Sequence, residues 1–275
     1  MQEEPRIPIG YPLDPITLGM TEAYDEFPKA PAGFDPHGEW SHSYRIYGIH
    51  GYKTHPRSMN ATMGFLHIKR TNLTDNKLQL NITKHSMGDR GNVHELNCEM
   101  ICEKDLLGTP FSWFINNTFY DYYGHERKNL SYAEKGSIER GTVNIWKQNT
   151  RSSISLNGRI TSDWSLFEAL QRMDISEPIS KPFDVLFGLS VLRQEHRLSD
   201  QGKFIYAKEG DKREFHLFHE IGPGMVPYEY YLDDSHFLLA VFTMNVAYFY
   251  DPMAEDIFTQ RLTLERQSTQ RKARQ

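Results

Sequence analysis

Three short stretches of the sequence, GIHGYKTHPR, KHSMGDRGNVHE and FYDYYGHER, concentrate side chains that carry protons or charge. Histidine titrates near neutral pH, and tyrosine can deliver or take a proton when a neighbouring cation lowers its pKa. Arginine adds a fixed positive charge that can hold a carboxylate. Together these residue types are suited to acid–base chemistry on an acidic substrate.

Elimination from a uronic sugar is one reaction that needs this set, because it requires a cation for the carboxylate, a base for the adjacent carbon proton and an acid for the leaving oxygen. We predict the catalytic residues to be His50, Tyr52, His85 and His94. The predicted substrate-binding residues are His55, Arg57, Arg90, Trp113, Tyr120 and Tyr122. Two-carboxylate hydrolysis would instead use Asp89 with Glu95, or Asp121 with Glu126. Loops at the end of a sheet are also polar simply because they are wet, so a purely structural interpretation stays open for each residue.

A metal site is a further alternative, because His50, His85 and His94 could supply three imidazoles from adjacent strands. The chain has 12 histidines, so such encounters also arise by chance. We therefore predict no metal and no cofactor. Cys98 and Cys102, four positions apart on an expected strand, would lie about 13 Å from each other, too far for a disulfide. They are expected to be buried structural residues.

Aromatic residues favour a carbohydrate as the ligand, because flat rings stack on the apolar faces of sugars while polar side chains bond the hydroxyl groups. The candidates for stacking are Trp113, Tyr120, Tyr122, Tyr228 and Tyr230. Packing in the core or across strands explains several of them equally well. Gly222, Pro223 and Gly224 are predicted to form a hairpin connection without a chemical role.

The elements that must position these residues are mainly strands. LQLNIT places Leu78, Leu80 and Ile82 on one face of a half-buried strand. The predicted strands of the first half are 44–52, 64–70, 77–85, 93–103, 111–122 and 141–157, and strand patterns resume from KFIYAK onward. DWSLFEALQRM has helical spacing, with Ser162 or Asp163 as its cap, whereas FDVLFGLSVLR is ambiguous between helix and strand. The expected fold is mainly β: an antiparallel meander forming a curved sheet or half-barrel, with one central helix and a Pro-rich N-terminal arm.

Three regions follow from this pattern: a Pro-rich arm over residues 1–40, a single all-β domain over 41–258, and a polar, basic C-terminal tail over 259–275. In a meander, successive strands reverse direction, so alternate connections meet at one end of the sheet. Counting from the first strand places 50–57, 84–95 and 120–127 at the same rim. This juxtaposition is the main structural prediction.

Composition limits the possible partners. With 39% hydrophobic residues and a formal charge of -5, the chain has no basic field to attract nucleic acid, and its apolar runs are too short to span a membrane. The start, MQEEPRIPIGYPLDP, is typical of a mature secreted chain from which a leader has been removed, so we expect a periplasmic or secreted location. Five Asn-x-Ser/Thr sequons, at Asn60, Asn72, Asn81, Asn116 and Asn129, matter only in a eukaryotic protein, and chance explains them as well.

The order of a meander, then WSLFEALQRM, then PFDVLFGLSVL and VPYEYYLDDSHFLLAV resembles bacterial extracytoplasmic half-barrel proteins related to the lipoprotein-carrier fold. The resemblance implies a concave sheet, partly covered by a helix, that can hold an elongated ligand. Lipoprotein carriers have an apolar concave face, whereas the strands here carry many His, Tyr and Asn residues. We therefore expect an extracytoplasmic protein that engages a carbohydrate chain at the rim. The alternatives are a glycan-cleaving enzyme of the lyase type and a carrier or sensor of an apolar ligand, and the oligomeric state stays open.

Overall fold

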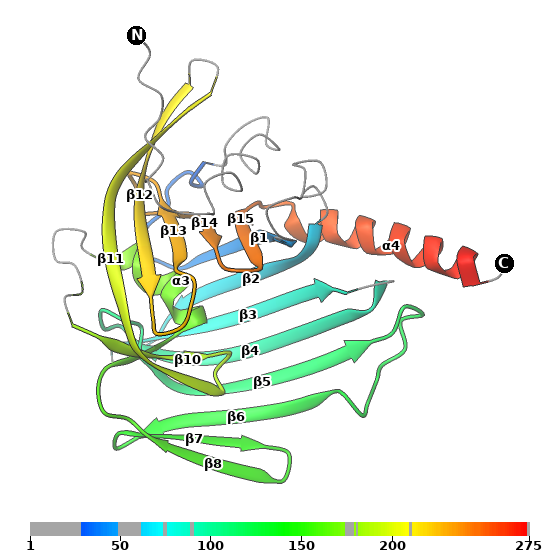
Figure 1. The fold of residues 1–275 in the computed structure, drawn as a ribbon, viewed down its shortest axis with the longest axis horizontal. Coiled ribbons are helices and arrows are strands. Elements are labelled where there is room, and N and C mark those ends of the chain that lie inside the picture. Colours follow the sequence, from blue (N-terminus) through cyan, green and yellow to red (C-terminus); the bar gives the residue numbers. More distant parts are fainter. Residues whose placement is uncertain are drawn as a thin grey trace.

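The computed structural model describes residues 29–48, 62–73, 76–88, 91–173, 179, 181–208 and 211–273. Its strands form one sheet that curls around a short helix (Figure 1). In chain order the elements are β1 (Trp40–Gly48), β2 (Thr62–Asn72), β3 (Lys77–Met87), β4 (Val93–Glu103), β5 (Pro110–Tyr120), β6 (Tyr132–Glu139), β7 (Thr142–Lys147), β8 (Thr150–Ser155), β9 (Ile160–Ser162), α3 (Asp163–Arg172), β10 (Phe183–Phe187), β11 (Val191–Lys208), β12 (Asp211–Ile221), β13 (Tyr228–Leu232), β14 (Leu238–Phe242), β15 (Val246–Tyr250) and α4 (Ala254–Ala273). The predicted mainly β fold is confirmed.

Strand β1 joins the two halves of the sheet. The order across the sheet is β8-β7-β6-β5-β4-β3-β2-β1-β15-β14-β13-β12-β11-β10-β9. Strands that are adjacent in the sheet are therefore also consecutive in the sequence, except for β1 and β15. All pairs are antiparallel apart from β9 with β10. The meander predicted from alternation is therefore present in each half, and one pairing between the first and last strands combines them.

Two strand predictions differ from the structure. Residues 141–157, predicted as one strand, form the hairpin β7–β8, which turns at Gln148 with a positive φ of 50°. The preceding strand, β6, was not predicted, because YAEKGSIE offers few apolar residues and contains a glycine. That glycine, Gly136, has a structural role: a Cβ atom there would lie 2.0 Å from the Trp113 ring, so the indole packs directly on bare backbone. The ambiguous FDVLFGLSVLR forms β10, a turn and the start of β11.

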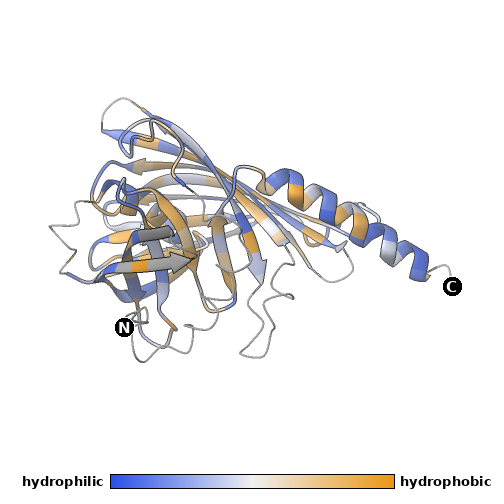
Figure 2. Cartoon of the chain, turned by 90° about the horizontal axis from the view of Figure 1, so that it is seen from above, coloured by the Kyte–Doolittle hydropathy of each residue, from blue (hydrophilic) through white to orange (hydrophobic). Residues whose placement is uncertain are grey.

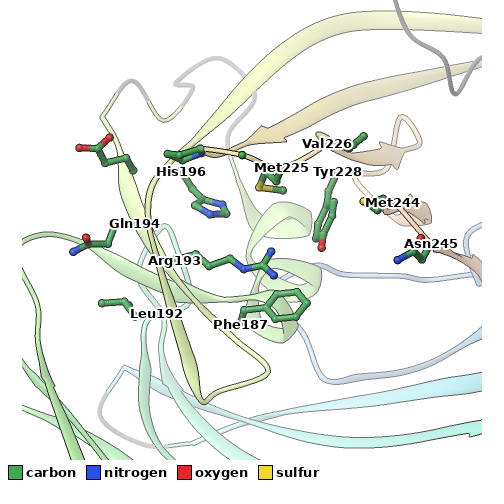
Figure 3. A pocket seen from close by; sticks show the side chains of 13 residues that line it. Phe187, Leu192, Arg193, Gln194, His196, Met225, Val226, Tyr228, Met244 and Asn245 are labelled. Atoms are coloured by element: carbon green, nitrogen blue, oxygen red, sulfur yellow. The ribbon is translucent and has the colours of Figure 1, made fainter.

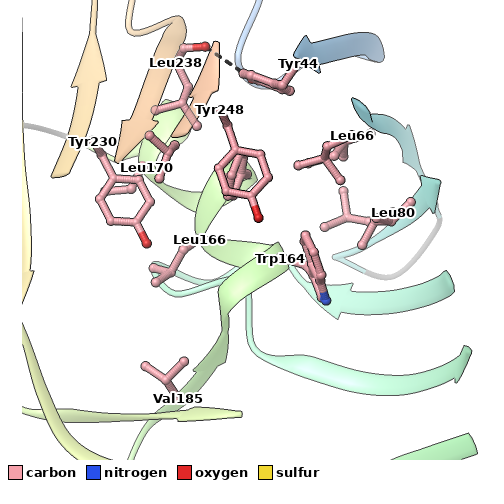
Figure 4. Packing of buried hydrophobic residues seen from close by; sticks show 14 of the residues in the cluster. Tyr44, Leu66, Leu80, Trp164, Leu166, Leu170, Val185, Tyr230, Leu238 and Tyr248 are labelled. Carbon is pink, nitrogen blue, oxygen red and sulfur yellow. Dashed lines mark hydrogen bonds between the residues drawn. The ribbon is translucent and has the colours of Figure 1, made fainter. Parts of the chain in front are cut away.

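Helix α3 fills the concave side of the sheet. Ser162 caps it with a reciprocal capping box, its side chain accepting from the Ser165 backbone while the Ser165 side chain accepts from the Ser162 backbone, as the predicted start allowed. Leu166 and Leu170 face aromatic residues of the sheet, including Tyr230 (Figure 4). Nearly the whole helix is buried, so it forms the centre of the core instead of a lid over an open cavity.

Helix α4 packs on the opposite, convex face of the sheet. Its Phe258 side chain joins Phe65, Met87 and Val93 in a small second cluster. Leu262 also packs against this cluster, and Arg266 donates to the carbonyl groups of Gly91 and Asp121. The last part of the helix is mostly hydrophilic and extends beyond the body of the protein (Figures 1 and 2). A single helix was predicted, and α4 was missed because its apolar stripe is only about one turn long. The predicted tail, 259–275, is the exposed continuation of α4 as far as residue 273.

A buried ion pair fixes α3 to the sheet and to the segment before β1. Arg70 on β2 donates to Glu168 at 2.8 Å, and both side chains are almost fully buried. The Arg70 guanidinium also donates to the carbonyl groups of His37 and Gly38. Arg172, one turn further along α3, donates to the same carboxylate. This network therefore holds together the described end of the Pro-rich arm, β2 and the central helix.

No helix in the described ranges combines the length and the apolar character required to cross a membrane.

Candidate functional site

One end of the sheet collects strand ends from both halves, and we call it the rim. In the first half, cross-strand pairs connect Ser86 on β3 with His94 on β4, and His94 with Phe119 on β5. In the second half, β1 ends at Gly48 opposite Val246 of β15. The same end continues through the pairs Glu229–Phe242 and Glu220–Tyr228. The predicted meeting of 84–95 with the end of β5 is confirmed. His50, Tyr52, His55, Arg57 and Arg90 lie outside the described residues, as does Asp89.

His94 faces the concave side of the rim. Its Nε2 atom lies 2.7 Å from the Asn117 amide oxygen, and its ring stacks on Phe119 with the centroids 4.4 Å apart. Burial lowers the pKa of His94, and the Asn117 hydrogen bond opposes part of that change. His94, Phe119, Tyr120 and Arg127 line a cleft of about 420 Å³. Two predicted site residues, His94 and Tyr120, thus line one cleft at the strand ends, His94 from the concave side and Tyr120 from the convex side.

His85 points to the other face of the sheet. His85 pairs with Glu95, and the next pair along the two strands is Ser86 with His94. Because side chains at successive strand positions point to opposite faces, His85 and His94 lie on different faces of the sheet. The His85 ring packs between Phe65 and Phe258, beneath α4, and burial lowers its pKa. His85 and His94 therefore leave the sheet on opposite faces, because the meander brings the strands together but the register separates the side chains.

The remaining predicted aromatic residues have different surroundings. Tyr120 packs against the cluster of Phe65 and Phe258 on the convex face, and Tyr122 lies against Tyr123 with ring centroids 4.1 Å apart. Trp113 is 4% exposed in the main core, far along β5 from Tyr120. Packing in the core was the alternative left open for Trp113, and this position does not let its ring meet a ligand at the rim.

A larger pocket, of about 750 Å³, lies in the second half of the rim (Figure 3). We call it the Arg193 pocket. It is formed by the end of β10, the start of β11, the β12–β13 loop, the start of β13 and the β14–β15 turn. The side chains and backbone that line it belong to Phe187, Leu192, Arg193, Gln194, Glu195, His196, Pro223, Gly224, Met225, Val226, Tyr228, Met244 and Asn245. Such a volume suits a small ligand or one or two sugar units.

Arg193 supplies a positive charge in this pocket. Its guanidinium carbon lies 4.1 Å from the centroid of the Phe187 ring, a cation–π arrangement that fixes its position. It also donates a hydrogen bond to the Tyr228 hydroxyl; burial raises the pKa of Tyr228, and the guanidinium opposes part of that rise. Within the part of the chain that the structure describes, Arg193 forms no ion pair with a carboxylate. Its charge is therefore held by packing and remains available to an anion.

A buried chain of three polar groups supports the pocket from behind. The His196 Nδ1 atom lies 2.7 Å from one oxygen of Glu220, and the Tyr230 hydroxyl donates to the other oxygen at 2.6 Å. Burial, together with the neighbouring carboxylate, raises the pKa of Tyr230 well above its usual value. The backbone of Gly222 covers the imidazole so closely that a Cβ atom there would lie 2.7 Å from Nε2. The orientation of His196 is consequently fixed.

Polar groups continue along the concave face between the Arg193 pocket and His94. Asp163, the first residue of α3, accepts a hydrogen bond from the Gly188 backbone at 3.0 Å, and burial raises its pKa to about 7. Lys84 opposes part of that rise, and its Nζ atom lies 3.4 Å from the Tyr248 hydroxyl. Among the described residues no group of three or more His, Cys, Asp or Glu side chains is arranged to hold a metal ion.

Arg193 and His196 were not predicted from the sequence because VLRQEHR has no motif, and Arg193 ended the segment that was ambiguous between helix and strand. Two signals were present. Tyr228 was a stacking candidate, and the glycine-proline-glycine connection at 222–224 was identified as a turn but given no role. In the structure this turn covers His196 and lines the pocket.

Comparisons with known proteins give little beyond the fold. No protein-family model matches the chain, and no curated protein sequence matches it. Among solved structures, it is similar to a crystal structure described as a beta-barrel-like protein of domain of unknown function DUF1849 from Brucella abortus. The TM-score is 0.49 at 7% sequence identity, over 78% of this chain and 96% of that chain. The expected resemblance is thus confirmed only as a mainly β, barrel-like neighbour whose own function is unknown.

Proposed function

We propose that this protein is an extracytoplasmic binding protein, with a half-barrel fold of the lipoprotein-carrier type, that takes an acidic carbohydrate into the Arg193 pocket. The observation that carries the proposal is the Arg193 guanidinium, which lies in a pocket of about 750 Å³ without a carboxylate partner among the described residues. A planar guanidinium donates two parallel hydrogen bonds to a carboxylate, which is the group that distinguishes a uronic sugar from a neutral one.

The neutral side chains around Arg193 suit the rest of such a ligand. The Tyr228 hydroxyl and the Asn245 amide can bond sugar hydroxyl groups, and Met225 and Val226 offer apolar contact to the ring faces (Figure 3). The pocket opens at the rim, where the cleft beside His94 offers a second contact region for a longer chain.

Binding to oligosaccharides tests the proposal directly. Calorimetric titration would compare oligouronates, neutral oligosaccharides of equal length and a fatty acid. We expect the oligouronate alone to bind, and Arg193→Met to weaken it by about ten- to hundredfold, because a charge-assisted hydrogen bond contributes about 1.5–3 kcal/mol. Arg193→Lys should lose less affinity than Arg193→Met. Arg197 is an exposed arginine on the same strand, and Arg197→Met should bind the oligouronate like the wild type.

Three outcomes would overturn this assignment. Neutral and acidic sugars could bind equally, Arg193→Met could leave the affinity unchanged, or the fatty acid could bind in place of the sugars. The last result would favour the carrier of an apolar ligand.

Cleavage is a second candidate function, favoured by the His196–Glu220 hydrogen bond in the same pocket as Arg193 and Tyr228. In an elimination, the Gly222 turn would first move off the imidazole, so that His196 Nε2 takes the proton from the carbon next to the carboxylate. The bond to the leaving oxygen would break as a double bond forms, and Tyr228 would protonate that oxygen. Absorbance from new double bonds, present with the wild type and absent with Tyr228→Phe, would establish catalysis. Binding without product would leave the protein as a binding module.

A further inference from the structure

The first half of the sheet, together with its connections, carries a set of asparagines that share a modification motif. The chain contains 13 asparagines and 34 serines and threonines in 275 residues, so a random order would give one or two sequons, yet there are five. Asn60 lies outside the described residues. The other four are Asn72, Asn81, Asn116 and Asn129.

Each described sequon asparagine is accessible to solvent. None of the four described sequon asparagines is buried. Outside the sequons, Asn117 and Asn144 are buried, and Asn76, Asn92, Asn149, Asn157 and Asn245 are exposed. A glycan is bulky and must stay in solvent after folding, so this is the distribution that glycosylation requires. The four sites also lie between β2 and the β5–β6 connection, and no sequon occurs after residue 131, in the half that forms the Arg193 pocket. Glycans at these sites would leave that pocket open.

Asn116 has a further feature that points to a sugar. Phe114 lies two positions before it on β5, on the same face and about 7 Å away along the strand. The Phe114 ring is 50% exposed, with Glu99 and Lys135 as its cross-strand neighbours. An apolar ring in such a place gains by stacking on the apolar face of a pyranose. Helix α4 leaves this ring open to solvent: its contacts in the first half are with residues near the strand ends, such as Phe65, Met87 and Val93.

We propose that Asn116 and Asn129 carry N-linked glycans and that Phe114 stacks under the first sugar at Asn116. In this transfer the side-chain amide nitrogen bonds to the anomeric carbon of an oligosaccharide, the bond from that carbon to a lipid pyrophosphate breaks, and the amide loses one proton. The lipid-linked oligosaccharide is the co-reactant, so the chain must enter a secretory lumen. The Asn72 and Asn81 amides are engaged in hydrogen bonds with neighbouring groups and are secondary sites.

Peptide mass spectrometry of the protein from the cells that naturally produce it tests the modification. Peptide-N-glycosidase converts a glycosylated asparagine into aspartate, and we expect this conversion at Asn116 and Asn129. Unmodified asparagine in both peptides would overturn the proposal. In protein secreted from a eukaryotic host, Thr118→Ala should abolish the glycan at Asn116, and Thr118→Ser should retain it.

Thermal denaturation before and after enzymatic deglycosylation tests the stacking. Removal of the glycans should lower the Tm of the wild type, and this loss should be smaller in Phe114→Ala. Phe111→Ala is the matched control, because Phe111 is an exposed ring on the same strand that Lys77 already covers at 3.3 Å. Equal losses in all three proteins would rule out a role for Phe114. Phe114→Leu, which keeps the apolar surface but not the flat ring, replaces the alanine variant if that variant does not fold.

Discussion

Removal of the Glu168 charge should destabilise the protein strongly, because this carboxylate neutralises a buried arginine. The Arg70 and Glu168 side chains are 1% and 0% exposed, and their ion pair measures 2.8 Å. In Glu168→Leu the Arg70 guanidinium would keep its hydrogen bonds to two carbonyl groups but lose its counter-ion. Breaking a buried pair from one side costs about 3–5 kcal/mol. That cost is a large part of the total stability of an ordinary domain, about 5–15 kcal/mol.

Differential scanning calorimetry or urea denaturation can measure this loss. We expect the Tm of Glu168→Leu to fall by roughly 6–15 °C, at about 2–3 °C for each kcal/mol. Arg172→Met is the matched control, because it removes a second partner of Glu168 while leaving the Arg70 pair intact, and it should cost about 1 kcal/mol. The double variant Arg70→Met/Glu168→Leu should recover much of the loss, since the fully buried Arg70 charge is then removed with its counter-ion, and only Arg172, whose side chain is 8% exposed, loses an ion-pair partner.

A loss below about 1 kcal/mol in Glu168→Leu would refute the reasoning, because the counter-ion would then contribute no more than an exposed pair. A double variant as unstable as the sum of its parts would refute it independently. In that case the two residues would act through packing alone, without electrostatic coupling.

Two further predictions concern the core and the start of α3. The Asp163 carboxyl, whose pKa rises from 3.8 to about 7 on folding, holds a proton that the unfolded chain releases, so the free energy of unfolding should fall by up to about 1.4 kcal/mol for each pH unit between those values. Asp163→Asn should flatten this slope in urea titrations from pH 4 to 8, and an unchanged slope would contradict the pKa. Gly136→Ala should destabilise by about 1–3 kcal/mol, because its Cβ atom meets the Trp113 ring at 2.0 Å. Gly158→Ala, with no atom within 4 Å, should change thermal stability little, and similar losses in the two variants would count against this explanation.

Local patterns were sufficient to predict the elements whose side chains alternate cleanly. Strand β3 carries Leu78, Leu80 and Ile82 on its buried face, and Ser162 caps α3, because both features depend on residues close in sequence. Strand β6 and helix α4 were missed because each depends on a distant partner. The glycine at position 136 of β6 is required because the Trp113 ring packs directly on its backbone. The Phe258 side chain of α4 packs against apolar residues on the convex face of β2 and β3.

The limits of the site prediction have a similar cause. Counting strand reversals brought 84–95 and the end of β5 to one rim, but the register then decided which face each side chain occupies. His94 and His85 lie on neighbouring strands and point to opposite faces, because one unit of register moves a side chain through the sheet. Near their ends these strands carry polar residues on both faces, so the sequence pattern did not show which face of the sheet each histidine occupies.

The Arg193 pocket would have followed from the same counting if one pairing had been known. Antiparallel pairing of β1 with β15 places Val246 opposite Gly48, so the β14–β15 turn lies at the rim that the first half predicts. Each further reversal then brings the start of β13 and the end of β12 to the same end, where Tyr228 and Glu220 pair. The pairing of β1 with β15 joins residues about 200 positions apart, so no local sequence pattern specifies it. It depends instead on the packing of Tyr44 and Ile46 with Tyr250 and Tyr248 around α3. Arg193, His196 and Tyr228, none of which was among the predicted catalytic or binding residues, thus lie at the same end of the sheet but in its other half. Their proximity therefore depends on how the sheet closes around its helix and on no motif in the chain.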